Sequence, residues 1–104
     1  MTNIFEREVV EGPQIQGEDE RIVWTLDISP WGSSPSSVSV VIKDEAGNNV
    51  TATKSTGLPV VASATLINCP VIHSLTAGSQ YRVEVKFTAS GQVFEAFFIL
   101  IAEV

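Results

Sequence analysis

Side chains that could perform covalent or metal chemistry are few in this sequence of 104 residues. It has one cysteine, Cys69, and one histidine, His73. A nucleophilic site pairs a cysteine or serine with a histidine and an acidic residue, because the histidine must take up the nucleophile's proton. Cys69 and His73 are four positions apart, around Pro70, in a segment that predicts a loop and has no pattern of a known nucleophilic site. We therefore interpret Cys69 as a small apolar side chain and His73 as a solvent-exposed loop residue.

Other combinations of residues also predict no catalytic or metal site. One histidine with one cysteine cannot supply the ligands of a structural zinc ion. The turn with Asp44, Glu45 and Asn48 lacks the glycine position and the closing glutamate of an EF-hand loop, and the seven glycines are scattered and form no phosphate-binding loop. Glu84 and Glu95 fall on adjacent predicted strands beside basic residues, which indicates a surface charge ladder. We therefore expect no enzyme activity, no metal and no cofactor.

Composition predicts one folded domain. A chain with 44% apolar and 17% charged residues has the size of a single domain and is too apolar for wholesale disorder. Its formal charge of −6 disfavours nucleic acid and anionic membranes as partners, because both require a basic surface. Residues 1–27 carry −5 of this charge and residues 28–104 carry −1. We therefore divide the chain into an acidic N-terminal segment, residues 1–20, with a possible first strand, and a domain at residues 21–104.

No targeting or membrane segment is recognisable in the sequence. The acidic N-terminus lacks the basic and apolar regions of a secretory signal peptide. The longest apolar run, residues 96–102, is too short to cross a bilayer and lies between Glu95 and Glu103. We expect a cytoplasmic protein, with an exported origin as the alternative if a signal peptide has been removed.

Alternation with a period of two residues recurs along the chain, whereas no window shows a helical stripe. It predicts strands at residues 21–28, 37–43, 60–67, 81–88 and 93–104, a hairpin partner at residues 50–54 and an N-terminal strand near residues 5–10. Polar turns separate these strands, among them the one at residues 44–49. About seven short antiparallel strands in a chain of this length predict an all-β fold, an immunoglobulin-like or fibronectin-III-like β-sandwich.

The last two strands give the most specific structural prediction. A two-residue turn at Ser90 and Gly91 lets glycine take up a positive φ and fixes the register of the hairpin. The facing pairs are then Ala89 with Gln92, Phe87 with Phe94, Lys86 with Glu95, Val83 with Phe98 and Tyr81 with Leu100. Apolar residues face apolar residues and opposite charges face each other, which stabilises a hairpin by about 0.2–1 kcal/mol per pair. A shift by one residue would remove all of these matches.

Both faces of the last strand are apolar. Alternate residues form the face directed to the core, yet Phe97, Ile99 and Ile101 lie on the opposite face. Large apolar side chains on an outer face imply that something covers them, either the N-terminal segment of the same chain or another subunit. Trp31, in a loop rich in proline, glycine and serine, is a second candidate contact, with packing on its own domain as the alternative. The candidate interface is therefore Phe97, Ile99, Ile101 and Trp31.

Several blocks of the sequence resemble a known group of proteins. They are WTLDISPWG at residues 24–32, VSVVIKD at residues 38–44, and LTAG at residues 75–78 followed by YRVEVKFT at residues 81–88 and FEAFF at residues 94–98. In order and spacing they are similar to the small single-domain immunoglobulin-like proteins encoded by tailed phages and prophages. The resemblance covers residues 20–103 and leaves the acidic N-terminus outside.

This resemblance implies a role rather than a reaction. It implies a non-enzymatic structural or accessory protein of the phage head or tail, with other phage structural subunits or further copies of itself as partners. Such a protein is present in the host cytoplasm during assembly and then in the virion. Similarity to the fibronectin-III connection implies that the Tyr81 hydroxyl bonds to the backbone of the preceding loop, as in a tyrosine corner. The alternative is an exported adhesion or carbohydrate-binding module whose Trp31 and end loops face the ligand.

Overall fold

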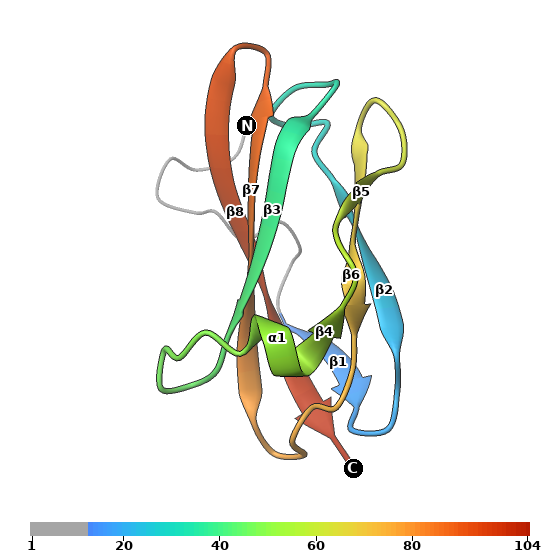
Figure 1. Ribbon diagram of the computed structural model, residues 1–104, viewed down its shortest axis with the longest axis vertical. Helices are drawn as coiled ribbons and strands as arrows, with labels where there is room; N and C mark the ends of the chain where they lie inside the picture. The colour runs from blue at the N-terminus through green and yellow to red at the C-terminus, as the bar shows by residue number, and fades with distance from the viewer. Residues whose placement is uncertain (1–12) are drawn as a thin grey trace.

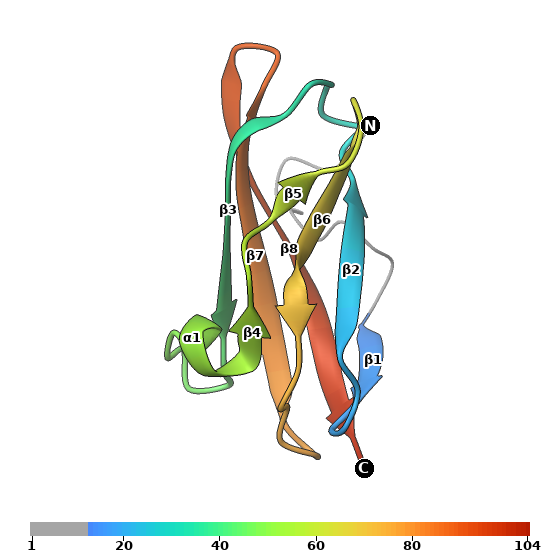
Figure 2. The ribbon, with the colours of Figure 1, turned by 45° about the vertical axis from the view of Figure 1, so that its right-hand side comes forward.

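The computed structural model describes residues 13–104, which fold into two packed four-stranded sheets and one short helix, α1 (Thr51–Lys54) (Figure 1). Sheet A contains, in spatial order, β1 (Gln14–Gly17), β8 (Gln92–Glu103), β7 (Gln80–Ala89) and β3 (Ser36–Lys43). Sheet B contains β2 (Ile22–Asp27), β6 (Leu66–Ile72) and β4 (Ser55–Thr56), and β5 (Val60–Val61) also pairs with β6. Figure 2 shows the two layers side by side, with β3 and β7 in one and β2 and β6 in the other. The prediction of a mostly-β, sandwich-like fold is thereby confirmed.

One strand pair is parallel, although the sequence predicts only antiparallel strands. β1 runs parallel to β8, with Ile15 opposite Ile101. This strand lies within the acidic segment at residues 1–20 and has only four residues, too few for alternation to reveal it. The strand expected near residues 5–10 lies outside the described residues.

The hairpin of β7 and β8 has the predicted register. All five expected pairs occur, from Ala89 with Gln92 at the turn to Tyr81 with Leu100. Ser90 and Gly91 both have positive φ, 52° and 76°, as a primed two-residue turn requires. The hairpin forms the two central strands of sheet A, so it sets the positions of the side chains on both faces of that sheet.

Residues 50–54 do not form the predicted hairpin partner of β3. Residues 51–54 instead form α1, and β4 after it pairs with β6 in the other sheet. Asn49 Oδ1 accepts hydrogen bonds from the Thr51 N–H and hydroxyl at 3.0 and 2.7 Å, while Thr51 Oγ1 accepts one from the Ile42 N–H at 2.9 Å. The Thr51 side chain thus takes the place of a backbone partner, and the chain crosses to sheet B.

No helix of residues 13–104 has the length and apolar character needed to cross a membrane.

Residues 60–67 also depart from the predicted single strand. A turn separates β5 from β6, and β6 continues through Cys69 and Pro70, which we expected in a loop. Pro70 has no backbone N–H and would interrupt a regular ladder. Here two β6 residues, Cys69 and Pro70, lie opposite one β2 residue, because the register shifts between Val23 and Thr25. β4 and β5 pair with β6 on either side of this bulge, which is why proline is tolerated within the strand.

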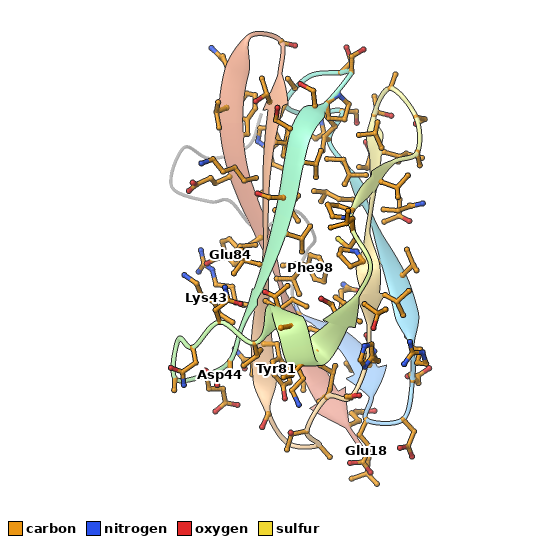
Figure 3. The ribbon with its side chains drawn as sticks, in the orientation of Figure 1. Glu18, Lys43, Asp44, Tyr81, Glu84 and Phe98 are labelled. Carbon is orange, nitrogen blue, oxygen red and sulfur yellow. The ribbon has the colours of Figure 1, made fainter. Side chains whose placement is uncertain are left out.

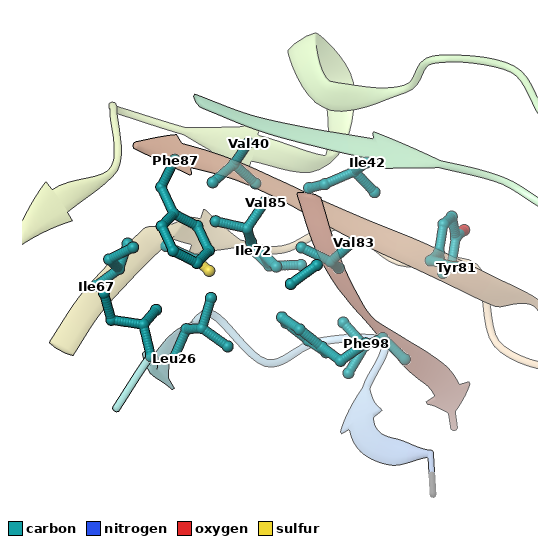
Figure 4. Packing of buried hydrophobic residues seen from close by; sticks show 14 of the residues in the cluster. Leu26, Val40, Ile42, Ile67, Ile72, Tyr81, Val83, Val85, Phe87 and Phe98 are labelled. Carbon is teal, nitrogen blue, oxygen red and sulfur yellow. The ribbon is translucent and has the colours of Figure 1, made fainter. Parts of the chain in front are cut away.

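Apolar side chains from both sheets fill the space between them (Figure 4). Phe87 is fully buried and contacts two other rings: its centroid lies 5.6 Å from that of Phe94 and 6.4 Å from that of Trp31. Near the other end, the Tyr81 hydroxyl accepts a hydrogen bond from the Thr76 N–H at 3.0 Å. The expected bond between this tyrosine and the preceding loop is therefore confirmed.

One fully buried polar side chain, that of Gln16 on β1, joins the two sheets. Its amide nitrogen donates to the carbonyl oxygens of Glu20 and Ile72 at 3.0 and 2.7 Å, and its Oε1 accepts from Trp24 Nε1 at 2.8 Å. Both amide N–H groups and the oxygen have partners, which is the condition under which an amide is buried without a large penalty. Gln16 thereby links β1 to β2 and to the end of β6.

Candidate functional site

The outer face of sheet A carries three of the predicted interface residues. Alternation along β8 directs Phe97, Ile99 and Ile101 away from the core, and each is half-buried. On β1, Ile15 lies opposite Ile101 and is 55% exposed. Because β1 pairs with the edge of β8, it widens the apolar face instead of lying over it. We name Ile15, Ile101, Ile99 and Phe97 the apolar row. The N-terminal residues that we considered as an intrachain cover lie outside the described part of the chain.

A row of charged side chains, Arg82, Glu84 and Lys86 on β7, runs beside the apolar row. Glu84 forms ion pairs with two cations: its carboxylate lies 2.9 Å from Arg82 Nε and 3.4 Å from Lys43 Nζ of β3. Lys43 and Glu84 lie close together in Figure 3. The charge ladder expected around Glu84 is thus present. All three side chains of this cluster keep between 32% and 49% of their surface exposed, so a partner in solution can reach them.

The two rows border a hollow of about 450 Å³. Its lining includes Val41 from β3, the charged row from β7 and Phe97 from β8. The Arg82 guanidinium carbon lies 3.8 Å from the centroid of the Phe97 ring, a distance at which a cation is attracted to the face of an aromatic ring. The Arg82 guanidinium therefore covers one face of the Phe97 ring while it remains paired with Glu84.

Cations are concentrated on this face. Of the five basic residues within 13–104, Lys43, Arg82 and Lys86 line the hollow, together with two acidic residues, Glu84 and Glu95. The remainder of the described chain holds seven acidic and two basic residues. An apolar row and a local excess of positive charge thus lie side by side on a protein that is acidic elsewhere.

Trp31 lies apart from the apolar row. It is half-buried, packs against the core, and contacts Phe87, which points away from the outer face of sheet A. Its backbone N–H donates to the Ile28 carbonyl oxygen at 2.8 Å, which folds the loop back on the domain. This geometry favours packing of Trp31 on its own domain over the role of a free contact residue.

Cys69 and His73 lie close in sequence but are poorly suited to nucleophilic chemistry. Cys69 is buried within β6, as expected for a small apolar side chain, and burial raises the pKa of its thiol to about 12, so the thiolate is scarce near neutral pH. His73 is half-buried, not exposed as predicted. Its Nε2 lies 2.7 Å from Thr56 Oγ1 and its Nδ1 lies 2.7 Å from Ser74 Oγ. Both ring nitrogens therefore contact hydroxyl groups.

The carboxylate of Asp44 closes the predicted turn at residues 44–49. Asp44 Oδ1 accepts hydrogen bonds from the N–H groups of Ala46 and Asn48 at 3.0 and 2.9 Å, and Gly47 takes a positive φ of 84°. This carboxylate therefore has a structural role in the turn. Within the described range, no group of three or more histidine, cysteine or acidic side chains is arranged to hold a metal ion.

Fold and face together define the class of this molecule as a small, mostly-β sandwich with an amphipathic outer sheet face. Comparison with family models, with curated proteins and with solved structures finds no match. The sequence analysis identified the part of the apolar row on β8 but not Ile15, Val41 or Lys43. These residues reach the face through pairings with distant strands, and alternation within one strand carries no signal for such pairings.

Proposed function

We propose that this chain is a non-enzymatic binding domain that assembles with other protein subunits through the outer face of sheet A. The observation that carries the proposal is the apolar row beside the charged row on a regular sheet. Contiguous apolar surface on a small domain marks a contact site more often than scattered apolar residues do. Aromatic and arginine side chains are also the types that dominate the energy of protein interfaces, and Arg82 lies directly against Phe97 here.

The order of the strands supports an immunoglobulin-like arrangement for the domain. If β2, β3, β4, β6, β7 and β8 are taken as strands B, C, D, E, F and G, the sheets contain B-E-D and C-F-G, as in immunoglobulin domains. The bond between the Tyr81 hydroxyl and the loop before β7 also fits this family of sandwiches. The position of β1 beside β8 departs from the constant-type arrangement, in which the first strand joins the other sheet.

A tailed phage is the biological setting that we propose, with a structural or accessory role in the head or tail. The support is the resemblance of the sequence blocks, which fall on β2, β3, β7 and β8. These strands contribute to the core and to the outer face of sheet A. Other structural subunits of the particle, or further copies of this chain, are the proposed partners during assembly in the host cytoplasm and then in the virion.

Particle incorporation tests this function. The full chain with an epitope tag is produced during phage growth, and purified particles are analysed by quantitative mass spectrometry. We expect the chain in particles at a constant ratio to other subunits, and we expect Ile101→Lys to reduce it by about tenfold, since Ile101 lies beside Ile15 in the apolar row and a lysine there places a charge within an apolar contact. Val60→Lys on sheet B is the matched control, because Val60 is 58% exposed.

Circular dichroism and urea unfolding establish that both variants remain folded. Absence of the chain from purified particles, or incorporation of folded Ile101→Lys at the level of the control, would contradict the proposed function.

A further inference from the structure

We infer, on the basis of the docking role proposed above, that the outer face of sheet A receives an extended, acidic segment of a partner protein, with acidic and apolar side chains alternating on its contacting side. Such a segment presents one side chain to the face at every second residue, about every 7 Å. Its pattern is read from the register of the four strands of sheet A.

Strand pairing arranges the outward side chains of sheet A in four cross-strand sets, each at one level along the strands. In order along the sheet, and from β3 toward β1, the sets are Gln80–Ile101–Ile15, Lys43–Arg82–Ile99, Val41–Glu84–Phe97 and Ser39–Lys86–Glu95. Adjacent sets are two residues apart along each strand, and this spacing equals the repeat of side chains on one face of an extended segment. The first and third sets are mainly apolar, and the second and fourth contain the cations.

Complementarity then specifies the contacting residues of the partner as apolar, acidic, apolar and acidic at successive alternate positions. The first apolar residue lies over Ile101 and Ile15, and the second lies over Val41 and Phe97 in the hollow. The first acidic residue meets Lys43 and Arg82, and the second meets Lys86, whose charge the adjacent Glu95 of β8 partly offsets. Glu84 already neutralises part of the charge of Lys43 and Arg82, so the incoming carboxylate shares these two cations with it.

Charge distinguishes this partner from a second copy of the chain. A symmetric contact between two copies would bring together two identical faces, each with three basic and two acidic residues around the hollow. Like charges oppose such a pair, and complementary charges favour a partner segment with an excess of acidic residues.

Fluorescence anisotropy with the full chain tests the inference. The probe is a labelled nine-residue peptide with leucine and glutamate alternating on one side and threonine between them. Two control peptides carry lysine in place of glutamate, or serine in place of leucine. We expect the glutamate–leucine peptide to bind at least about tenfold more tightly than either control, because each control removes one of the two complementary features.

Variants of the chain locate the binding. Lys86→Glu is expected to weaken the glutamate–leucine peptide by about fivefold, and Glu84→Gln to strengthen it by about twofold, because the latter frees two cations. Arg21→Glu is the matched control. It makes the same change in charge between β1 and β2, away from the face, and should leave the Kd unchanged.

Equal binding of the lysine–leucine peptide, or an unchanged Kd in Lys86→Glu, would overturn the acidic partner and leave docking through this face in place. The inference also fails if no peptide binds. In that case, sedimentation that shows a dimer sensitive to Phe97→Ser assigns the face to a second copy and retains the proposed function. A monomer refutes the acidic segment, and the particle experiment then decides the proposed function independently.

Discussion

Both sheets expose apolar side chains on their outer faces, but in different ways. Around sheet B, the exposed fractions are 47% for Val23, 82% for Leu58, 58% for Val60 and 43% for Val61. On sheet A, Phe97 and Ile99 are less exposed, since both are half-buried and Arg82 covers one side of Phe97. Isolated exposed apolar side chains are common on protein surfaces. Sheet A is the better candidate interface although Phe97, Ile99 and Ile101 are less exposed, because they form a row beside ordered charges.

Strand construction explains this difference between the two faces. β7 and β8 have ten and twelve residues and pair without a register shift. β4 and β5 have two residues each, and β6 is bulged at Cys69 and Pro70. A regular ladder keeps successive outward side chains in rows, whereas a bulge rotates them out of line. Exposure alone therefore does not identify a docking face, and regular register together with charge order is the more useful criterion.

The largest effect is expected where the sheets are joined. Gln16→Leu should lower the free energy of unfolding by about 3 kcal/mol, because the Trp24 indole N–H and the Ile72 carbonyl lose a buried partner. Urea unfolding monitored by tryptophan fluorescence measures the change. Gln14→Leu on the same strand is the matched control and should change stability by less than about 0.5 kcal/mol. A similar stability for both variants would mean that β1 is not anchored to sheet B through this amide.

Alkaline pH should destabilise the fold by ionising the buried thiol of Cys69, which lies in the bulge of sheet B. Burial raises the pKa of the Cys69 thiol from 9.0 to about 12, so the folded state favours the protonated thiol. The associated stability is complete below pH 9 and is lost between pH 9 and pH 12, at about 1.4 kcal/mol per pH unit. Relative to Cys69→Val, the wild-type chain should therefore lose about 2 kcal/mol between pH 8 and pH 10.5. Parallel pH profiles of the two proteins would contradict this assignment.

A smaller effect compares the two outer faces directly. Phe97→Ala should destabilise the chain by about 1–2 kcal/mol, because it removes a half-buried ring and its contact with the Arg82 guanidinium. Val60→Ala on sheet B should change stability by less than about 0.5 kcal/mol, since Val60 is 58% exposed. Urea unfolding of both variants at the same pH and ionic strength measures the difference. An equal loss would show that Phe97 contributes no more to its sheet than an exposed valine.

Much of sheet A could be predicted from local sequence. The pairs from Ala89 with Gln92 to Tyr81 with Leu100 follow from one turn and an alternating pattern, since the two strands are adjacent in the chain. The predicted hairpin partner at residues 50–54 and the predicted single strand at residues 60–67 were both wrong. The Asn49 and Thr51 side chains redirect the first segment, and in the second the strand continues through Pro70, which ordinarily ends a ladder.

The candidate site divides in the same way. Alternation along β8 was sufficient to place Phe97, Ile99 and Ile101 on one outer face, and the sequence by itself determined that both faces of this strand are apolar. Only the tertiary structure brought Ile15 and Lys43 to the same face, and only the tertiary structure directed Trp31 onto Phe87. The physical reason is range: neighbouring side chains on a strand are ordered by the backbone repeat. Other features depend on contacts that form only when the two sheets pack. They are the parallel edge strand, the bulge at proline and the hydrogen bond from the buried Gln16 amide to the Ile72 carbonyl, 56 positions away.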